Sequence, residues 1–243
     1  MRRPKAISFD MGYTLLMHRP TGLDLYRRVL AECGIDATSE AVSAALVPAR
    51  DHYVRSTREG RDFEASMVDA VAFWTEYNSI ILTHLEVAVQ RHAEVSERIY
   101  TTAWQPENWE IFPEVMETLE ALRAEGVRMV VVSNFVDTLR SVCEVHRVAP
   151  YFEDIIASVE AGAMKPDSRI FTLALRRLGV EAEDVWHVGD NYWADVLGSR
   201  AVGMTPVLVD RERAVPRPDC ATVQSLDQLV DMVRQAEDRE AAA

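Results

Sequence analysis

Residues 6–15 of the chain read AISFDMGYTL, and this stretch decides how the rest of the sequence is interpreted. Its first four residues form a short, mostly apolar run that predicts a buried strand, and Asp10 follows at once. An acidic side chain directly after a buried strand lies at the carboxyl edge of a parallel sheet, where ligands bind. We therefore expect Asp10 to belong to a functional site rather than to cap a turn.

Four later segments repeat this pattern of a short apolar run followed by polar residues. They are rich in valine and isoleucine and are bounded by turn residues: 129–132, 155–157, 185–188 and 206–209. Amphipathic helical patterns accompany them at 113–124, at 168–178 and from Ser225 onward. Strands that alternate with helices predict an α/β fold, with a Rossmann-like parallel sheet covered by helices on both faces.

Residues 16–112 interrupt this alternation, because we find no convincing strand there. Helical periodicity instead runs through three stretches: 40–58, 63–85 and 87–102. A run of helices this long cannot be one crossover between neighbouring strands. We therefore expect a Rossmann-like core, formed by residues 1–15 and 113–243, and an inserted all-helical cap domain of residues 16–112, with approximate boundaries.

The charge balance of the chain restricts its partners. Acidic residues outnumber basic ones by 39 to 26, which gives a net charge of -13 at pH 7. A field of this sign repels nucleic acid and anionic membranes, so we expect neither as a partner. A phosphorylated substrate would need local positive charge from a metal or a lysine. The absence of a long apolar run and the three scattered cysteines favour a cytoplasmic protein, and nothing indicates an oligomeric state.

Polar groups that can react or bind a ligand end, or shortly follow, four of the five predicted strands. They comprise carboxylates, a hydroxyl, an amide and an ammonium: Asp10, Ser133, Asn134, Lys165, Asp190 and Asp195. Because the carboxyl ends of parallel strands meet at one edge of a sheet, we expect these groups to share one pocket. The set suits a hard divalent cation held by oxygen ligands, with a phosphate bound between the cation and Lys165.

Four motifs stand in a fixed order along the chain: FDMGYTL at 9–15, VVSN at 131–134, KPDSRIF at 165–171 and HVGDNYWAD at 187–195. In this order they resemble the motifs of the haloacid dehalogenase-like (HAD) hydrolase superfamily, in the group with a helical (C1-type) cap. The resemblance covers essentially the whole chain. It implies a Mg²⁺-dependent phosphatase that acts on a small phosphorylated metabolite through an aspartyl-phosphate intermediate.

The resemblance also implies a role for each matching residue. The catalytic residues would be the nucleophile Asp10 and Lys165. The phosphate would be bound by Ser133, Asn134 and Lys165. The metal ligands would be Asp10, Asp190, Asp195 and the backbone carbonyl of Gly12. Phosphoryl transfer needs the developing charge on oxygen to be neutralised, which Mg²⁺ and Lys165 would supply.

Gly12 departs from the family pattern, since phosphatases of the family have a second aspartate two residues after the nucleophile. That aspartate protonates the leaving oxygen and then activates water, and general acid–base catalysis of this kind contributes ~10²–10⁴-fold in rate. His18 lies just after the first motif and is a candidate substitute, although an ordinary loop histidine is the simpler interpretation. We interpret His187, inside a predicted strand, as a core histidine.

Several functions therefore stay open. The protein can be a phosphatase suited to good leaving groups or assisted by a cap residue, a phosphotransferase, or a weak or inactive phosphate-binding protein. A further alternative is an enzyme that cleaves a carbon–halogen or carbon–phosphorus bond, as dehalogenases and phosphonatases of the family do. Dehalogenases of the family lack the acidic fourth motif found here, and phosphonatases use a cap lysine, whereas no lysine lies between Lys5 and Lys165. Six arginines of the cap are candidate anion contacts: Arg19, Arg27, Arg50, Arg55, Arg58 and Arg61.

Overall fold

A six-stranded parallel sheet forms the centre of the protein, in the order β5-β4-β1-β6-β7-β8. The computed structural model describes residues 1–241, with side chains to residue 237, so residues 242–243 of the predicted core segment lie outside the described residues. All five predicted strands are present, and β8 is an addition. The strands are β1 (Ala6–Phe9), β4 (Arg128–Ser133), β5 (Asp154–Ala157), β6 (Val185–Gly189), β7 (Thr205–Val209) and β8 (Ala221–Val223).

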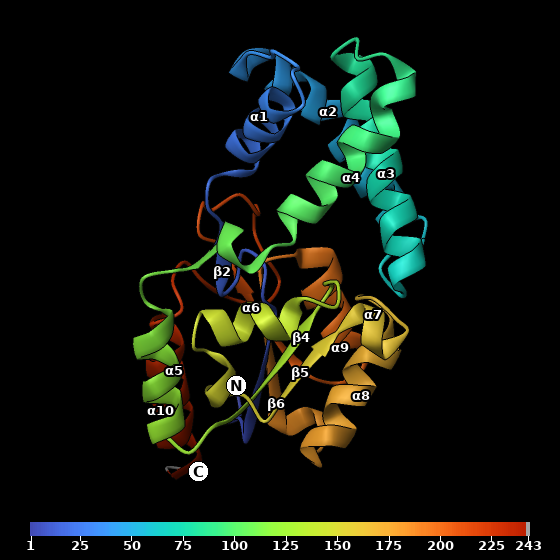
Figure 1. The fold of residues 1–243 in the computed structure, drawn as a ribbon. Helices are drawn as coiled ribbons and strands as arrows, with labels where there is room; N and C mark the ends of the chain where they lie inside the picture. Colours follow the sequence, from blue (N-terminus) through green and yellow to red (C-terminus); the bar gives the residue numbers. More distant parts are fainter. Residues whose placement is uncertain (242–243) are drawn as a thin grey trace.

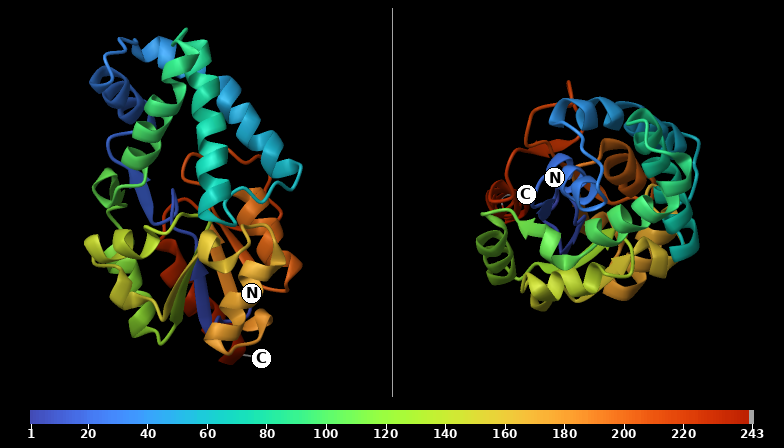
Figure 2. Two further views of the ribbon diagram at one scale, coloured as in Figure 1. Left: turned by 45° about the vertical axis from the view of Figure 1, so that its right-hand side comes forward. Right: turned by 45° about the horizontal axis from the view of Figure 1, so that its top comes forward.

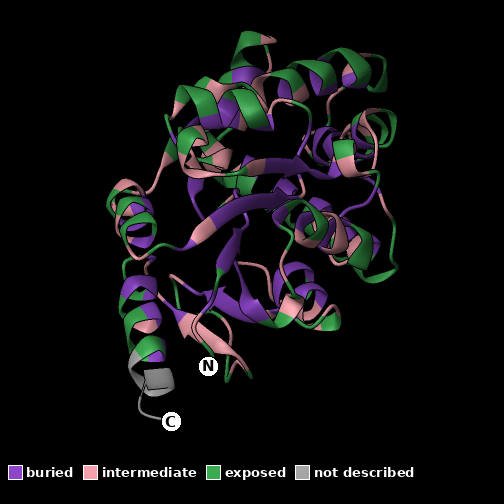
Figure 3. Cartoon of the chain, turned by 90° about the horizontal axis from the view of Figure 1, so that it is seen from below, coloured by how far each residue is buried: buried purple, intermediate pink, exposed green. Residues whose placement is uncertain are grey.

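Helices cover both faces of this sheet, as the sequence predicts (Figures 1 and 3). Successive side chains of a strand point to opposite faces, so Phe9 and Val131 pack in one hydrophobic cluster while Ala6 and Val132 pack in another. The first cluster includes helices α5 (Val115–Ala124), α6 (Leu139–Val145) and α10 (Gln228–Ala241). The second includes α8 (Ser168–Leu178).

Shorter elements complete the sheet-bearing part: η3 (Ala149–Tyr151), α7 (Ser158–Ala161), η4 (Ala182–Asp184), the π-helix η5 (Tyr192–Leu197) and α9 (Gly198–Ala201).

A separate group of helices stands over the carboxyl edge of the sheet (Figures 1 and 2). We call it the helical unit: α1 (Gly22–Glu32), α2 (Ser39–Arg58), α3 (Met67–His84), η1 (Val89–Arg91), α4 (His92–Ala103) and η2 (Pro106–Asn108). Its apolar faces pack around a third hydrophobic cluster of their own. That cluster includes Met164 from the sheet-bearing part, so the two groups of elements are in direct contact.

The expectation that residues 16–112 contain no strand is wrong at both ends of the segment. Strand β2 (Leu16–His18) pairs antiparallel with β3 (Trp109–Ile111), where the chain leaves and re-enters the sheet-bearing part. Three residues are too few to show the alternation of a half-buried strand, and this explains why the sequence pattern missed them. The same reason applies to β8. Within residues 1–241, the helices are too short or too polar to traverse a lipid bilayer.

Candidate active site

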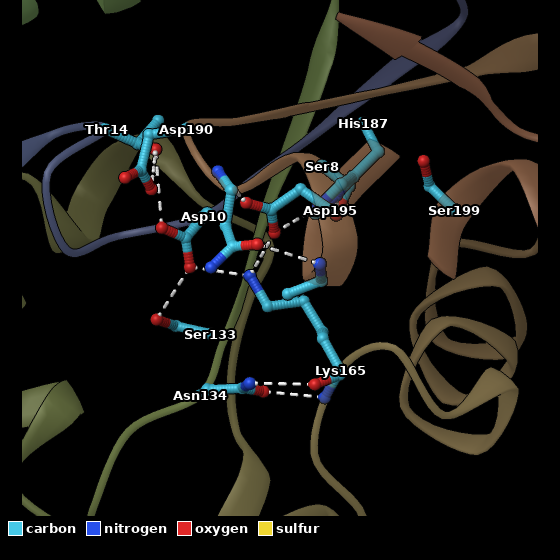
Figure 4. A network of polar contacts seen from close by, with 12 residues as sticks. Ser8, Asp10, Thr14, Ser133, Asn134, Lys165, His187, Asp190, Asp195 and Ser199 are labelled. Atoms are coloured by element: carbon cyan, nitrogen blue, oxygen red, sulfur yellow. Dashed lines mark hydrogen bonds and ion pairs between the residues drawn. The ribbon is translucent and has the colours of Figure 1, made fainter. Parts of the chain in front are cut away.

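Asp10 lies at the end of the central strand β1, between β4 and β6. Its backbone N–H donates to the carbonyl of Val188 at 2.8 Å, which continues the ladder to β6 by one residue. Its Oδ1 accepts hydrogen bonds from Ser133 Oγ at 2.9 Å and from Lys165 Nζ at 2.6 Å (Figure 4). The neighbouring strands β1 and β4 therefore bring the first and second motifs together at this carboxylate, and Lys165 of the third motif joins them from a connection between helices.

Lys165 reaches Asp10 from the connection between α7 and α8, and its side chain is almost fully buried. Its ammonium donates at 2.6 Å to Asp10 and at 2.6 Å to Oδ1 of Asp195. The side-chain amide of Asn134 fixes the backbone of the lysine, because it donates to the Lys165 carbonyl at 2.9 Å and accepts from the Lys165 N–H at 2.6 Å. The Asn134 side chain is therefore used chiefly to position Lys165.

A chain of buried polar groups lies behind Asp195. Its Oδ1 is 3.1 Å from Nε2 of His187, and Nδ1 of the same ring is 3.0 Å from Ser8 Oγ. Its Oδ2 accepts from the backbone N–H of Asn191 at 2.9 Å, at the start of the π-helix η5. His187 is fully buried, and burial lowers its pKa, so it is a neutral core histidine, as expected from its place in a strand.

Three carboxyl groups share this site with a single ammonium. Oxygens of Asp10, Asp190 and Asp195 lie within 4.8 Å of one another. The Thr14 hydroxyl is 3.3 Å from Asp10 Oδ2 and 3.5 Å from Asp190 Oδ1. Burial raises the pKa of Asp10 and of Asp190, and the neighbouring acids add to this, although Lys165 opposes it. Burial also acts on Asp195, but Lys165 and His187 outweigh it and hold its pKa low.

The carboxyl group of Asp195 passes directly over Gly189, the last residue of β6. A Cβ atom at Gly189 would lie 2.2 Å from Cγ of Asp195, closer than any two such atoms can approach. The backbone of Gly189 shows no left-handed φ, so its lack of a side chain serves this close approach rather than a turn. Glycine at this position therefore permits the contact between Asp195 and Lys165.

A cavity of about 700 Å³ opens above these groups, between the sheet edge and the helical unit. Asp10, Ser133, Lys165 and Asp190 line its floor, together with Gly12. Its walls are largely aromatic and come from the helical unit: Tyr26, Tyr53, Trp74, Tyr77, Tyr100 and Trp104. Among the residues that the structure describes, Arg50 is the only one of the six candidate arginines that lines this cavity.

The structure also places groups that sequence reasoning missed. Thr14 belongs to the first motif and could have been identified from its position four residues after Asp10. Glu64, in the wall of the cavity, carried no such signal, because it stands in a polar connection between two helices. His18 lines the cavity too, but its ring packs on Trp109 with 3.8 Å between centroids, and burial lowers its pKa.

A family model described as haloacid dehalogenase-like hydrolase matches residues 4–203. The chain belongs to this family. Its enzymes are hydrolases, so the sheet, the motifs and the site belong to a hydrolase. A zebrafish (Danio rerio) relative, haloacid dehalogenase-like hydrolase domain-containing protein 3, is 31% identical over 238 residues, which cover 94% of this chain and 96% of that protein. The human protein of the same name is 38% identical over 120 residues, and the match spans 48% of its length.

Two further comparisons concern the chemistry and the fold. The ribulose-1,5-bisphosphate 5-phosphatase of Halopiger xanaduensis is 33% identical over 140 residues, which cover 52% of this chain and 58% of that protein. A magnesium-bound putative HAD-hydrolase from Bacillus subtilis has a similar structure, with a TM-score of 0.79 at 18% identity, and covers 96% of this chain and all of its own. At this identity the likeness shows the fold alone.

The close approach at Gly189 yields a stability prediction. We expect Gly189→Ala to lower the free energy of unfolding by about 1–3 kcal/mol from overpacking alone, because the new methyl group must displace the Asp195 carboxyl. Gly22→Ala is the matched control, since a Cβ there meets nothing within 4 Å and the backbone is not left-handed. Urea unfolding of both variants measures the difference. Equal stabilities would contradict the close contact.

Proposed function

We propose that this hydrolase is a Mg²⁺-dependent phosphatase that acts on a small phosphorylated metabolite, with Asp10 as the nucleophile. The observation that carries the proposal is the environment of the Asp10 carboxylate. One of its oxygens is held by Ser133 and Lys165, and the other lies beside Thr14 and faces a second acid, Asp190. This arrangement combines a nucleophile, donors for phosphoryl oxygens and a set of hard oxygen ligands in one cavity.

The residues present fit a divalent metal ion. Three acids surround one ammonium, so the site is short of positive charge. Burial raises the pKa of Asp10 and Asp190, and the neighbouring acids add to this rise. A hard divalent cation would offset it, and carboxylate oxygens are the ligands that Mg²⁺ prefers. We propose that Asp10, Asp190 and the backbone carbonyl of Gly12 would hold the ion. When bound, it would neutralise charge on the phosphoryl oxygens.

Asp195 has a different part in this proposal from the one expected from the motif. Its oxygens lie within reach of the same metal position, but they already accept hydrogen bonds from Lys165, from His187 and from the N–H of Asn191. We propose that Asp195 acts mainly by holding the Lys165 ammonium in place. The Asn134 amide would do the same from the other side, through the backbone of Lys165.

The chain's own residues would then carry the reaction in two steps. A carboxylate oxygen of Asp10 would attack phosphorus while the Ser133 hydroxyl and the Lys165 ammonium donate to the phosphoryl oxygens, so that charge developing there is stabilised by fixed donors. Water would then cleave the aspartyl-phosphate. Splitting one difficult displacement into two easier ones is the benefit of a covalent intermediate.

We propose that residues 16–112, which contain the helical unit together with β2 and β3, form the cap that encloses the organic part of the substrate. Its aromatic residues form most of the cavity wall, and an enclosed cavity excludes water from the phosphoryl group. The phosphatase-named relative supports a phosphorylated substrate, since that name describes a reaction on a small sugar bisphosphate. The acidic cluster is the observation that favours a phosphatase over a dehalogenase, although dehalogenases share the fold.

We expect Asp10→Asn to abolish the Mg²⁺-dependent hydrolysis of p-nitrophenyl phosphate, because an amide oxygen is a far weaker nucleophile than a carboxylate. The fold should persist, since Lys165 keeps its ion pair with Asp195. Steady-state rates and circular dichroism melting of the variant measure the two effects. Asp36→Asn, an exposed acid in the helical unit, is the control and should retain wild-type activity. Activity near the wild-type level in Asp10→Asn would exclude Asp10 as the nucleophile.

We expect Asp190→Asn to raise the Mg²⁺ concentration needed for half-maximal activity, because the variant loses a charged oxygen ligand. A titration of activity with Mg²⁺ measures the shift, with Asp36→Asn again as the control for loss of one negative charge. Full wild-type activity in excess chelator would remove the metal from the mechanism and favour the dehalogenase alternative.

A further inference from the structure

Glu64 is a buried acid that the two steps above leave unused. Its side chain lies in the cavity wall and is only 2% exposed, in the connection between α2 and α3. Buried glutamates are rare and normally have an ionic partner. Here the indole N–H of Trp74 donates to Oε1 at 3.1 Å, and no described residue forms a hydrogen bond with Oε2. One carboxyl oxygen is therefore left for a molecule in the cavity.

The connection that carries Glu64 is fastened to the sheet-bearing part, close to Lys165. Two residues before Glu64, Asp62 accepts a hydrogen bond from the backbone N–H of Met164 at 2.9 Å. Its other oxygen pairs with the Arg169 guanidinium at 3.0 Å. Figure 1 shows this end of the helical unit reaching down beside α7 and α8. Because Met164 precedes Lys165 directly, the same anchor that fixes the connection brings Glu64 to the catalytic groups.

The surroundings of Glu64 favour its protonated form. Burial raises its pKa to about 7, while the Trp74 hydrogen bond and the Lys165 charge oppose the rise and Asp10 adds to it. The other titratable groups that act on it come from α2 and α4: Tyr53 and Tyr100. Burial raises the pKa of both phenols, to about 12 for Tyr100, so they stay neutral near pH 7. A carboxyl group with a pKa near the working pH is suited to proton transfer.

We propose that Glu64 is the general acid and general base of this enzyme, and that it supplies from the helical unit what Gly12 does not supply from the first motif. The inference rests on the proposed phosphatase function and on two geometric facts. Glu64 lines the cavity that Asp10 and Lys165 line, and its Oε2 has no hydrogen-bond partner among the side chains that the structure describes, residues 1–237. The Trp74 indole would stabilise the carboxylate that forms after the proton leaves.

The proton balance closes over the two steps. In the first, an Asp10 oxygen bonds to phosphorus, the ester P–O bond breaks, and the Oε2 proton of Glu64 passes to the leaving oxygen, which departs as an alcohol. In the second, the Glu64 carboxylate takes a proton from water as the water oxygen bonds to phosphorus. The bond from phosphorus to Asp10 then breaks, which gives inorganic phosphate, the Asp10 carboxylate and protonated Glu64.

His18, the substitute acid considered from the sequence, is less suited to this role. Its ring is stacked on Trp109, and its Nδ1 lies 3.3 Å from the Asn108 carbonyl. Burial lowers its pKa, although this hydrogen bond opposes the shift. His18 is therefore neutral near pH 7, and a neutral imidazole is a poor general acid. Glu64 has the opposite tendency, since burial favours its protonated form.

The test compares two esters with aromatic bodies and different leaving groups, p-nitrophenyl phosphate and 2-phenylethyl phosphate, in the Mg²⁺-loaded enzyme. An aryl oxide leaves well unaided, whereas an alkoxide needs a proton. We expect Glu64→Gln to lower kcat/KM for the alkyl ester ~10²–10⁴-fold, and to lower that of the aryl ester far less. Glutamine keeps the size and the acceptor for Trp74 but has no transferable acid proton. Glu76→Gln, at an exposed position of α3, is the control and should change neither rate.

The pH profile gives a second reading. Because protonated Glu64 is the active form, alkyl-ester kcat/KM in the wild type should fall as pH rises through about 7, the pKa of Glu64. This limb should be absent in Glu64→Gln. Adding Gly12→Asp to that variant should restore alkyl-ester turnover. The Gly12 backbone is not left-handed, and a Cβ there would meet only the Trp109 ring, at 3.8 Å.

The outcomes separate this inference from the proposed function. One outcome would overturn the role of Glu64 while supporting the phosphatase function. In it, the wild type hydrolyses the aryl ester, and Glu64→Gln changes neither the ratio of alkyl-ester to aryl-ester kcat/KM nor the fall in rate as pH rises. An equal fall for both esters, with the pH limb retained, would indicate a structural role and would also overturn it. Failure of the wild type to hydrolyse either ester at any Mg²⁺ concentration would overturn both.

Discussion

The Lys165 ammonium lies 2.6 Å from a carboxylate oxygen on each side, with its side chain almost entirely removed from solvent. An unpaired ammonium in this position would be very costly, and removing one partner of a buried ion pair costs about 3–5 kcal/mol. The surrounding structure supplies the two carboxylates that the buried ammonium needs. Strand β1 delivers Asp10, the π-helix after β6 delivers Asp195, and Asn134 after β4 clamps the lysine backbone. Gly189 leaves room for the Asp195 carboxyl, and His187 supports it from the core.

The groups around Lys165 come from two parts of the structure, the sheet edge and the helical unit. The sheet edge provides groups that are rigidly spaced, because each follows a strand whose register is fixed by its neighbours. The helical unit provides the aromatic cavity wall and Glu64, held by Asp62 against the residue that precedes Lys165. In the proposed mechanism, phosphoryl transfer belongs to the first part, and proton transfer and substrate selection to the second. In the same proposal, Glu64 takes the place of the acid that Gly12 lacks, since both residues line one cavity.

Much of the fold could be predicted from the sequence because its signals are local. The five predicted runs are mostly apolar, as buried strands are, and the helix at 168–178 matches α8 residue for residue, since its apolar spacing and the following Gly179 are both explicit. The signals fail where elements are short. Strands β2, β3 and β8 have three residues each, and antiparallel pairing of β2 with β3 depends on segments more than 90 residues apart.

The sequence by itself determined the family, the parallel sheet and the polar residues that gather at its edge, because every one of them directly follows a strand or lies in an ordered motif. Which groups several of those residues contact follows only from the tertiary structure. Asn134 and Asp195 were expected to bind phosphate and metal. In the structure the Asn134 amide bonds to the Lys165 backbone, and Asp195 contacts the Lys165 ammonium, His187 and the backbone N–H of Asn191. Glu64 could not be selected at all. Burial raises its pKa, and that burial is produced by packing between parts of the chain that are distant in sequence.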